Sequence, residues 1–81
     1  MLATWRKRLS KKAAKMEVNV NGDRVEIPEN ATIGQLLGQL ELDTRAIAVE
    51  VNEQLQPRDT HESFVLSQDD RLEIVTLAGG G

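Results

Sequence analysis

The chain has 81 residues and a formal net charge of −3, and it contains no cysteine. A chain of this length forms one small domain, and the absence of cysteine excludes disulfides, a thiolate nucleophile and a thiolate metal site within it. The single histidine, His61, does not make a typical zinc site with scattered carboxylates. We therefore expect no metal site. We also expect no enzyme that acts alone, because so short a chain lacks the concave volume around most active sites.

Charge is unevenly distributed along the chain. Residues 1–15 contain six basic residues and no acidic one, whereas residues 16–81 hold the other four bases and all 13 acids, a net charge of −9. The acidic part disfavours nucleic acid and favours a protein partner with a basic docking surface. No stretch approaches the roughly 20 apolar residues of a membrane span, and the amino-terminal segment lacks the apolar centre of a secretion signal.

Residues 1–15 form a basic extension that we expect to be disordered or weakly helical, with Leu2, Trp5 and Leu9 along one side. Three interpretations stay open: an extension before the natural start of the protein, an organelle transit peptide, or an arm that binds a membrane surface or a partner. Met16 lies where the folded pattern begins and is a candidate natural start. We expect a cytoplasmic protein, or an organellar one if the extension is a transit peptide.

The first folded element is a predicted β-hairpin. Met16, Val18 and Val20 alternate with polar residues, the period-two pattern of a half-buried strand. Asn21-Gly22 follows, and both residues tolerate the positive φ of a tight hairpin turn. Residues 23–27 supply the returning strand, which Pro28 stops.

A helix of about three turns is predicted next. Thr32 is its candidate N-cap, with Gln35 as the capping-box partner three residues later. Gly34 and Gly38 each weaken this helix by roughly 1 kcal/mol relative to alanine; they either allow close approach to the sheet or are tolerated surface glycines. The helix carries one apolar stripe with i, i+3, i+4, i+7 spacing, made of Ile33, Leu36, Leu37 and Leu40.

The rest of the chain predicts shorter elements that end in a last strand. A strand is predicted at residues 46–51, with Ile47, Val49 and Val51 on one face. A short extended piece at 54–56, an irregular polar stretch at 58–63 and a brief apolar segment at 64–66 follow. A turn at 67–70 leads into the last strand at 71–76. Alternation in the last strand directs Leu72 and Ile74 toward the core.

The element order predicts an α+β fold. Strand, strand, helix, strand, short strand, strand gives a roll with one main helix on one face of a mixed sheet of four or five strands. If the first and last strands lie side by side, they run parallel in the sheet centre, which is the β-grasp or ubiquitin-like arrangement. The chain thus divides into the extension at residues 1–15, a β-grasp domain at 16–76 and a flexible glycine-rich tail at 77–81.

The tail carries the candidate chemistry. Gly79, Gly80 and Gly81 end the chain, and we expect them to project as a mobile arm that enters a partner's active site. Five extended residues reach roughly 17 Å. The reactive group is the terminal carboxylate of Gly81, a poor electrophile that must first be activated, for example as an acyl-adenylate made from ATP. The competing interpretation is a disordered terminus or linker remnant, which direct fusion to the last strand of a β-grasp domain disfavours.

Three other polar features were weighed as sites. We expect His61 to be a solvated side chain rather than a docking residue. Asp69-Asp70 is better explained by a turn than by a metal pair, because aspartate favours turns. Arg58 either tethers its loop or contacts a partner.

Several segments match a known family in their order and spacing: Val20-Asn21-Gly22, residues 32–37, 48–52, 55–58 and 72–75, and the glycine end. On these segments residues 20–81 resemble the ThiS sulfur carriers of thiamine biosynthesis, within the larger ThiS/MoaD β-grasp group. Two departures are visible. The family turn Asp-Gly-Asp is replaced by Gln68-Asp69-Asp70, which bears on turn geometry rather than chemistry, and the basic extension is not typical of the family.

The resemblance implies a mechanism and a set of partners. An adenylyltransferase of the ubiquitin-activating type would activate Gly81, a sulfur donor system such as a cysteine desulfurase would convert the adenylate to a thiocarboxylate, and thiazole synthase would receive the sulfur. The chain itself would bind no cofactor, since ATP is used by the activating partner. We expect docking through the sheet face and edge that lead to the tail, with acidic side chains steering the encounter. The residues expected there are Val75, Leu77 and Ala78.

Two alternative functions stay open at this point. The small subunit of molybdopterin synthase would use the same tail and the same activation but pass its sulfur to a pterin precursor. A β-grasp interaction module without carrier activity would leave the glycines without a chemical role.

Overall fold

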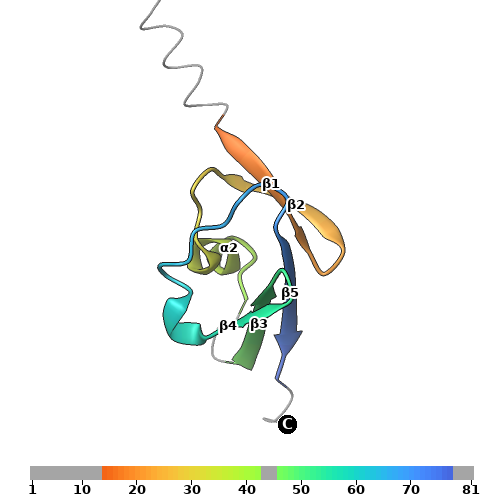
Figure 1. The fold of residues 1–81 in the computed structure, drawn as a ribbon, viewed down its shortest axis with the longest axis vertical. Coiled ribbons are helices and arrows are strands. Elements are labelled where there is room, and N and C mark those ends of the chain that lie inside the picture. Colours follow the sequence, from red (N-terminus) through yellow and green to blue (C-terminus); the bar gives the residue numbers. More distant parts are fainter. Residues whose placement is uncertain (1–13, 43–45, 78–81) are drawn as a thin grey trace, which may run out of the picture.

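The computed structural model describes residues 14–42 and 46–77 (Figure 1). Residues 1–13 of the predicted extension (1–15) and residues 78–81 of the predicted tail (77–81) lie outside these described residues. The elements are β1 (Lys15–Val20), β2 (Asp23–Pro28), α2 (Ile33–Gln39), β3 (Ile47–Val51), β4 (Gln54–Gln56), the 3₁₀ helix η2 (Arg58–Thr60) and β5 (Arg71–Thr76).

The strands form one five-stranded mixed sheet in the order β2-β1-β5-β3-β4. β5 lies in its centre, parallel to β1 and antiparallel to β3, and α2 covers one face (Figure 1). This confirms the α+β β-grasp prediction, including the parallel pairing of the first and last strands. The polar stretch expected to be irregular contains the single turn η2.

The β1–β2 hairpin has the predicted turn. Asn21 and Gly22 have φ values of 51° and 93°, the left-handed conformation that a tight hairpin turn requires. The Asn19 Oδ1 atom accepts the Gly22 N–H at 2.9 Å, which closes the turn. Pairing runs from Val20–Asp23 at the turn to Lys15–Pro28 at the open end, so β1 begins one residue before the predicted start.

The helix begins as predicted but is one turn shorter. The Thr32 hydroxyl accepts the Gln35 N–H at 3.1 Å and the Gln35 side chain accepts the Thr32 N–H at 2.9 Å, which completes the capping box. At the other end, Glu41 has φ 58°, its N–H donates to Gly38 and the Leu42 N–H donates to Leu37. This is a Schellman motif, so the seven residues of α2 make about two turns. The predicted three turns were wrong.

The core lies between α2 and the sheet. Ile33, Leu36 and Leu37 of the helix are fully buried, and the loops add Ala31 and Leu66. The strands contribute the side chains that alternation directs inward: Met16, Val18, Val20, Ile27, Val49, Val51 and Leu72. Leu72 is buried as predicted, and Ile74 packs partly buried against the same cluster.

The two helix glycines have different surroundings. A Cβ on Gly34 would meet the His61 carbonyl oxygen at 3.4 Å, whereas a Cβ on Gly38 would have no neighbour within 4 Å. Gly34 therefore permits close approach of the loop after η2, rather than of the sheet, and Gly38 is a tolerated surface glycine.

This difference gives a matched stability prediction. Gly38→Ala should raise the free energy of unfolding by about 0.5–1 kcal/mol, because alanine loses less backbone entropy in a helix and here fits into open space. Gly34→Ala should gain less, since its methyl group presses on the His61 carbonyl. Urea titrations of both variants measure the two values, and an equal gain at both positions would contradict this account of Gly34.

Candidate functional site

The candidate site is the carboxyl-terminal end of β5, where the chain leaves the domain. On one side β5 pairs with β3 as far as Thr76 opposite Ile47. The Leu77 N–H then donates to the Ala46 carbonyl at 2.7 Å, so the chain is held to the sheet through Leu77. Four residues follow to Gly81, a reach of roughly 14 Å when extended. The predicted tail residues Ala78, Gly79, Gly80 and Gly81 lie beyond the described residues.

The other side of β5 is held by a shorter strand pairing and a side chain. β1 pairs with β5 only at Asn19–Arg71 and Val20–Leu72. The chain then turns at Asn21, whose side chain accepts the Ile74 N–H at 2.8 Å and donates to the Ile74 carbonyl at 3.1 Å. Sequence reasoning assigned Asn21 to a turn only and missed this contact.

A second asparagine holds the start of β5. The Asn52 side chain accepts the Arg71 N–H at 3.0 Å and donates to the Asp70 carboxylate at 3.0 Å. Asn52 has φ 52°, nearly the value of Asn21. Two asparagines in left-handed turns therefore bond to the same central strand, Asn52 at its first residue and Asn21 at its fourth. For both contacts, the available sequence signal was an asparagine followed by a second turn residue, because asparagine tolerates positive φ.

Exposed apolar side chains lie on the sheet face opposite α2, two of them at and just after the end of β5 and one on the edge strand β4. Val75 and Leu77 are each 53% exposed and Leu55 is 64% exposed. Val75 lies opposite Ala48 and Leu55 opposite Glu50, which places them on the solvent face. We call Leu55, Val75 and Leu77 the apolar strip. Ala78, the third predicted docking residue, lies outside the described residues.

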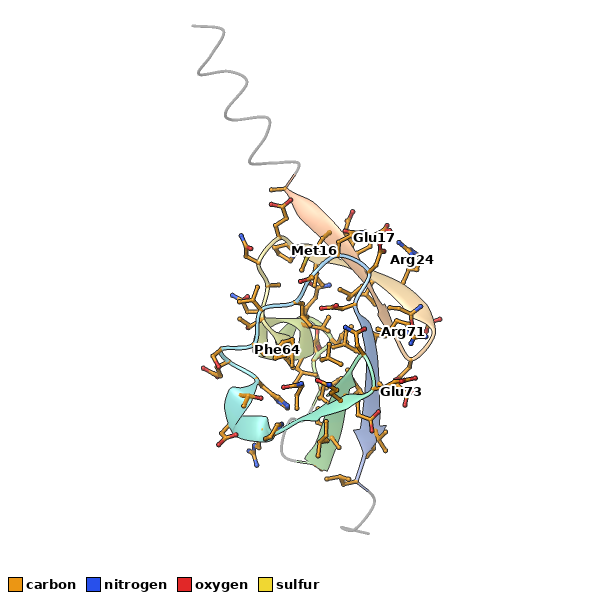
Figure 2. The ribbon with its side chains drawn as sticks, viewed as in Figure 1. Met16, Glu17, Arg24, Phe64, Arg71 and Glu73 are labelled. Carbon is orange, nitrogen blue, oxygen red and sulfur yellow. The ribbon has the colours of Figure 1, made fainter. Side chains whose placement is uncertain are left out.

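Acidic side chains border the apolar strip. Glu73 of β5 lies directly opposite Glu50 of β3, and like charges in such positions repel each other. Figure 2 shows Glu73 and Arg71 projecting from β5, and the Arg71 guanidinium is 3.9 Å from the Glu53 carboxylate. The face that leads to the tail therefore combines apolar contact area with negative charge.

Ion pairs join the hairpin to the turn before β5. Arg24 binds Glu17 and lies 3.5 Å from Asp69 (Figure 2). Hydrogen bonding and attraction to Glu17 raise the pKa of Arg24 above its ordinary value. All three side chains are about half exposed, so the pairs contribute little to stability.

The Asp69-Asp70 turn is confirmed. Asp69 has φ 69°, and the Asp70 carboxylate accepts the Ser67 N–H at 2.8 Å. Within residues 14–42 and 46–77, no group of three or more histidine, cysteine, aspartate or glutamate side chains is placed to hold a metal ion.

The prediction for His61 was wrong. Its side chain is 5% exposed, and its Nε2 atom lies 2.9 Å from the Gln56 carbonyl oxygen. Its own carbonyl accepts the Gly34 N–H at 2.8 Å. His61 therefore fastens the loop after η2 to both β4 and α2, a structural role. Arg58 is exposed, and among the described residues it takes part in no ion pair.

In the part of the chain that the structure describes, no helix is long and apolar enough to cross a membrane.

The comparisons with known proteins agree on one family. The ThiS family model matches residues 13–81. A protein named thiazole synthase from Paramagnetospirillum magneticum is 35% identical over 66 residues, which are 82% of this chain and 20% of that protein. The uncharacterized protein ycf40 of Porphyra purpurea is 30% identical over 82% of this chain and 93% of its own length. This chain thus spans about a fifth of the thiazole synthase and nearly all of the algal protein.

Solved structures agree with the sequence comparisons. The crystal structure of a thiamine biosynthesis protein (ThiS) from Geobacter metallireducens superposes with a TM-score of 0.72 at 25% identity, over 82% of this chain and all of that one. The solution structure of a thiamine biosynthesis protein from the same organism gives a TM-score of 0.67 at 26% identity, over 82% of this chain and 88% of that one.

The structural role of His61 leads to a stability prediction. His61→Ala should lower the free energy of unfolding by about 2 kcal/mol, because it removes the partner of the Gln56 carbonyl and opens a cavity at the core edge. The adjacent exposed residue gives a control, since Glu62→Ala should change stability by less than about 0.5 kcal/mol. Urea unfolding tests both variants, and a His61→Ala protein as stable as the parent would rule out this role.

Proposed function

Because this chain belongs to the ThiS family, we propose that it carries sulfur in thiamine biosynthesis as a thiocarboxylate on Gly81. One observation carries the proposal: the family match extends through the glycine end, which lies three to five residues after the strand in the sheet centre. A terminal carboxylate attached so closely to a rigid strand can be delivered into another protein's active site.

The chemistry proceeds in two proposed stages. A Gly81 carboxylate oxygen attacks the α-phosphorus of ATP, forming an acyl-adenylate while pyrophosphate leaves. A sulfur nucleophile then attacks the acyl carbon and AMP leaves. Hydrosulfide gives the thiocarboxylate directly, whereas a persulfide first gives an acyl disulfide that a second thiol cleaves to the thiocarboxylate.

The partners supply everything except the carboxylate. An adenylyltransferase of the ubiquitin-activating type brings ATP and the catalyst, and a donor such as a cysteine desulfurase brings the sulfur. Thiazole synthase receives it. The protein from Paramagnetospirillum magneticum supports thiazole synthase as the acceptor of the sulfur. A sequence similar to this chain forms part of that polypeptide, which is named thiazole synthase. In this scheme the chain is a protein co-substrate rather than an enzyme.

The thiamine pathway is favoured over the molybdopterin alternative. The matching family and a similar solved structure are both described as ThiS, and a relative is named thiazole synthase. The same evidence disfavours an interaction module without carrier activity.

The apolar strip is the proposed docking surface for the activating enzyme. Val75 and Leu77 lie on the same strand end that leads to Gly81, so an enzyme that surrounds the tail must also approach these side chains. Ala78 follows directly. Glu50 and Glu73 border this surface, and their charge would speed the encounter with a basic partner.

The carrier chemistry predicts a defined change in mass. With ATP, a competent activating enzyme and a sulfur source, the intact mass should rise by about 16 Da as one oxygen of Gly81 is replaced by sulfur. Deleting Gly81 should abolish the shift and leave the unfolding transition unchanged, because the buried core cluster is made of side chains between Met16 and Leu72. An unmodified full-length chain beside an activating enzyme that converts a known carrier would overturn the proposal.

The docking surface predicts different effects for two equally exposed valines. Val75→Ala should weaken binding to the activating enzyme about tenfold, because two methyl groups lose their burial at about 0.8 kcal/mol each. Val65 is the control, since it is 52% exposed and pairs with Thr32 at the start of α2, away from the strip. Calorimetric titration gives both affinities; equal values for the two variants would exclude this surface.

A further inference from the structure

We propose that Asn21 is a positioning residue for the reaction of Gly81, because its side chain fixes the half of β5 from which the tail leaves. The inference rests on the proposed carrier function. It assigns to this asparagine a role beyond forming the hairpin turn.

The Asn21 amide takes the place of a missing strand. Along the edge of β5 that faces β1, the Leu72 carbonyl accepts the Asn21 backbone N–H at 2.9 Å. The next backbone groups on that edge belong to Ile74, and β1 has already turned away. The Asn21 side chain satisfies both of them, its oxygen with the N–H and its nitrogen with the carbonyl. An amide has the same donor and acceptor as a peptide group, so it continues the ladder by one step.

This pair of hydrogen bonds at Ile74 lies three residues before Leu77, the last residue that the sheet holds before the tail. On the opposite edge, β3 holds β5 through Thr76, and the Ala46 carbonyl holds Leu77. With Asn21 in place, the strand is held on both edges as far as Ile74. Without it, β5 beyond Leu72 would be held on the β3 edge alone and would fray more easily.

Fraying would affect delivery of the carboxylate. The tail has only four residues after Leu77, so its direction depends on the strand end. If the strand end frays, the activating enzyme must order it again at each encounter. Ordering one residue carries an entropy cost that corresponds to a loss of roughly tenfold in productive binding.

The turn allows a substitution that removes only the side chain. Asn21 has φ 51°, a conformation that glycine adopts without strain, so Asn21→Gly keeps the hairpin and deletes the amide. Asn52 is the matched control. Its φ is 52° and its side chain also makes two hydrogen bonds to the β5 region, but at Asp70 and Arg71, far from the tail.

The experiment measures pyrophosphate release by the activating enzyme with each full-length variant as substrate, below the unfolding temperature of both. Asn21→Gly should lower kcat/KM about tenfold, chiefly through KM, and hydrogen exchange at the Ile74 amide should accelerate. Asn52→Gly should accelerate exchange at the Arg71 amide and leave kcat/KM within about twofold of the parent. Asn21→Asp, which keeps the acceptor for the Ile74 N–H and loses the donor, should fall between Asn21→Gly and the parent.

The outcomes separate this inference from the function on which it rests. If the parent chain supports no pyrophosphate release, the carrier proposal fails. If the parent reacts and the two glycine variants have equal kcat/KM, Asn21 has no positioning role. An unchanged exchange rate at Ile74 in Asn21→Gly would also overturn the inference, because the amide would then not hold the strand.

Discussion

β5 lies between β1 and β3, and its parallel pairing with β1 brings the two ends of the domain together in the middle of the sheet. The pairing is short, with two residues of β1 in register with two of β5. It depends on α2, because the chain must cross one face of the sheet before β5 can enter beside β1. The helix covers that face with three fully buried side chains, so the same core that buries the helix also holds the last strand in place through Leu72.

This arrangement gives β5 two roles along one segment. On its core-facing side, Leu72 is buried between sheet and helix, Ile74 is partly buried and Thr76 is exposed. The strand therefore passes from core to surface within six residues and is held on both edges for most of that distance. A tail that follows such a strand starts from a defined position.

The sequence alone predicted the features that depend on neighbouring residues. Alternation predicted β1 and β5, Asn21-Gly22 predicted the hairpin turn, and Thr32 with Gln35 predicted the capping box. The helix end was missed because Glu41 adopts a left-handed conformation that usually belongs to glycine. His61 was misjudged because its burial depends on a contact with the Gln56 carbonyl and on packing of a loop against α2. Neither is visible in polarity or spacing. The bond between Asn21 and Ile74 spans 53 residues. The proposed reactive residue, Gly81, comes from the glycine-rich end and the family resemblance.

A short tail on a rigid strand also explains why so small a chain suffices for the proposed role. Catalysis requires a shaped and water-excluding site, which the proposed role leaves to the partner enzymes. Presenting a carboxylate requires only reach and direction. Glycines give the reach, since they fit a narrow channel in any backbone conformation. The direction of the tail must come from the folded part of the chain, because glycine residues do not favour one backbone conformation. The fold therefore concentrates its restraint on β5, with a strand on each side at its start and an asparagine amide where the pairing with β1 ends.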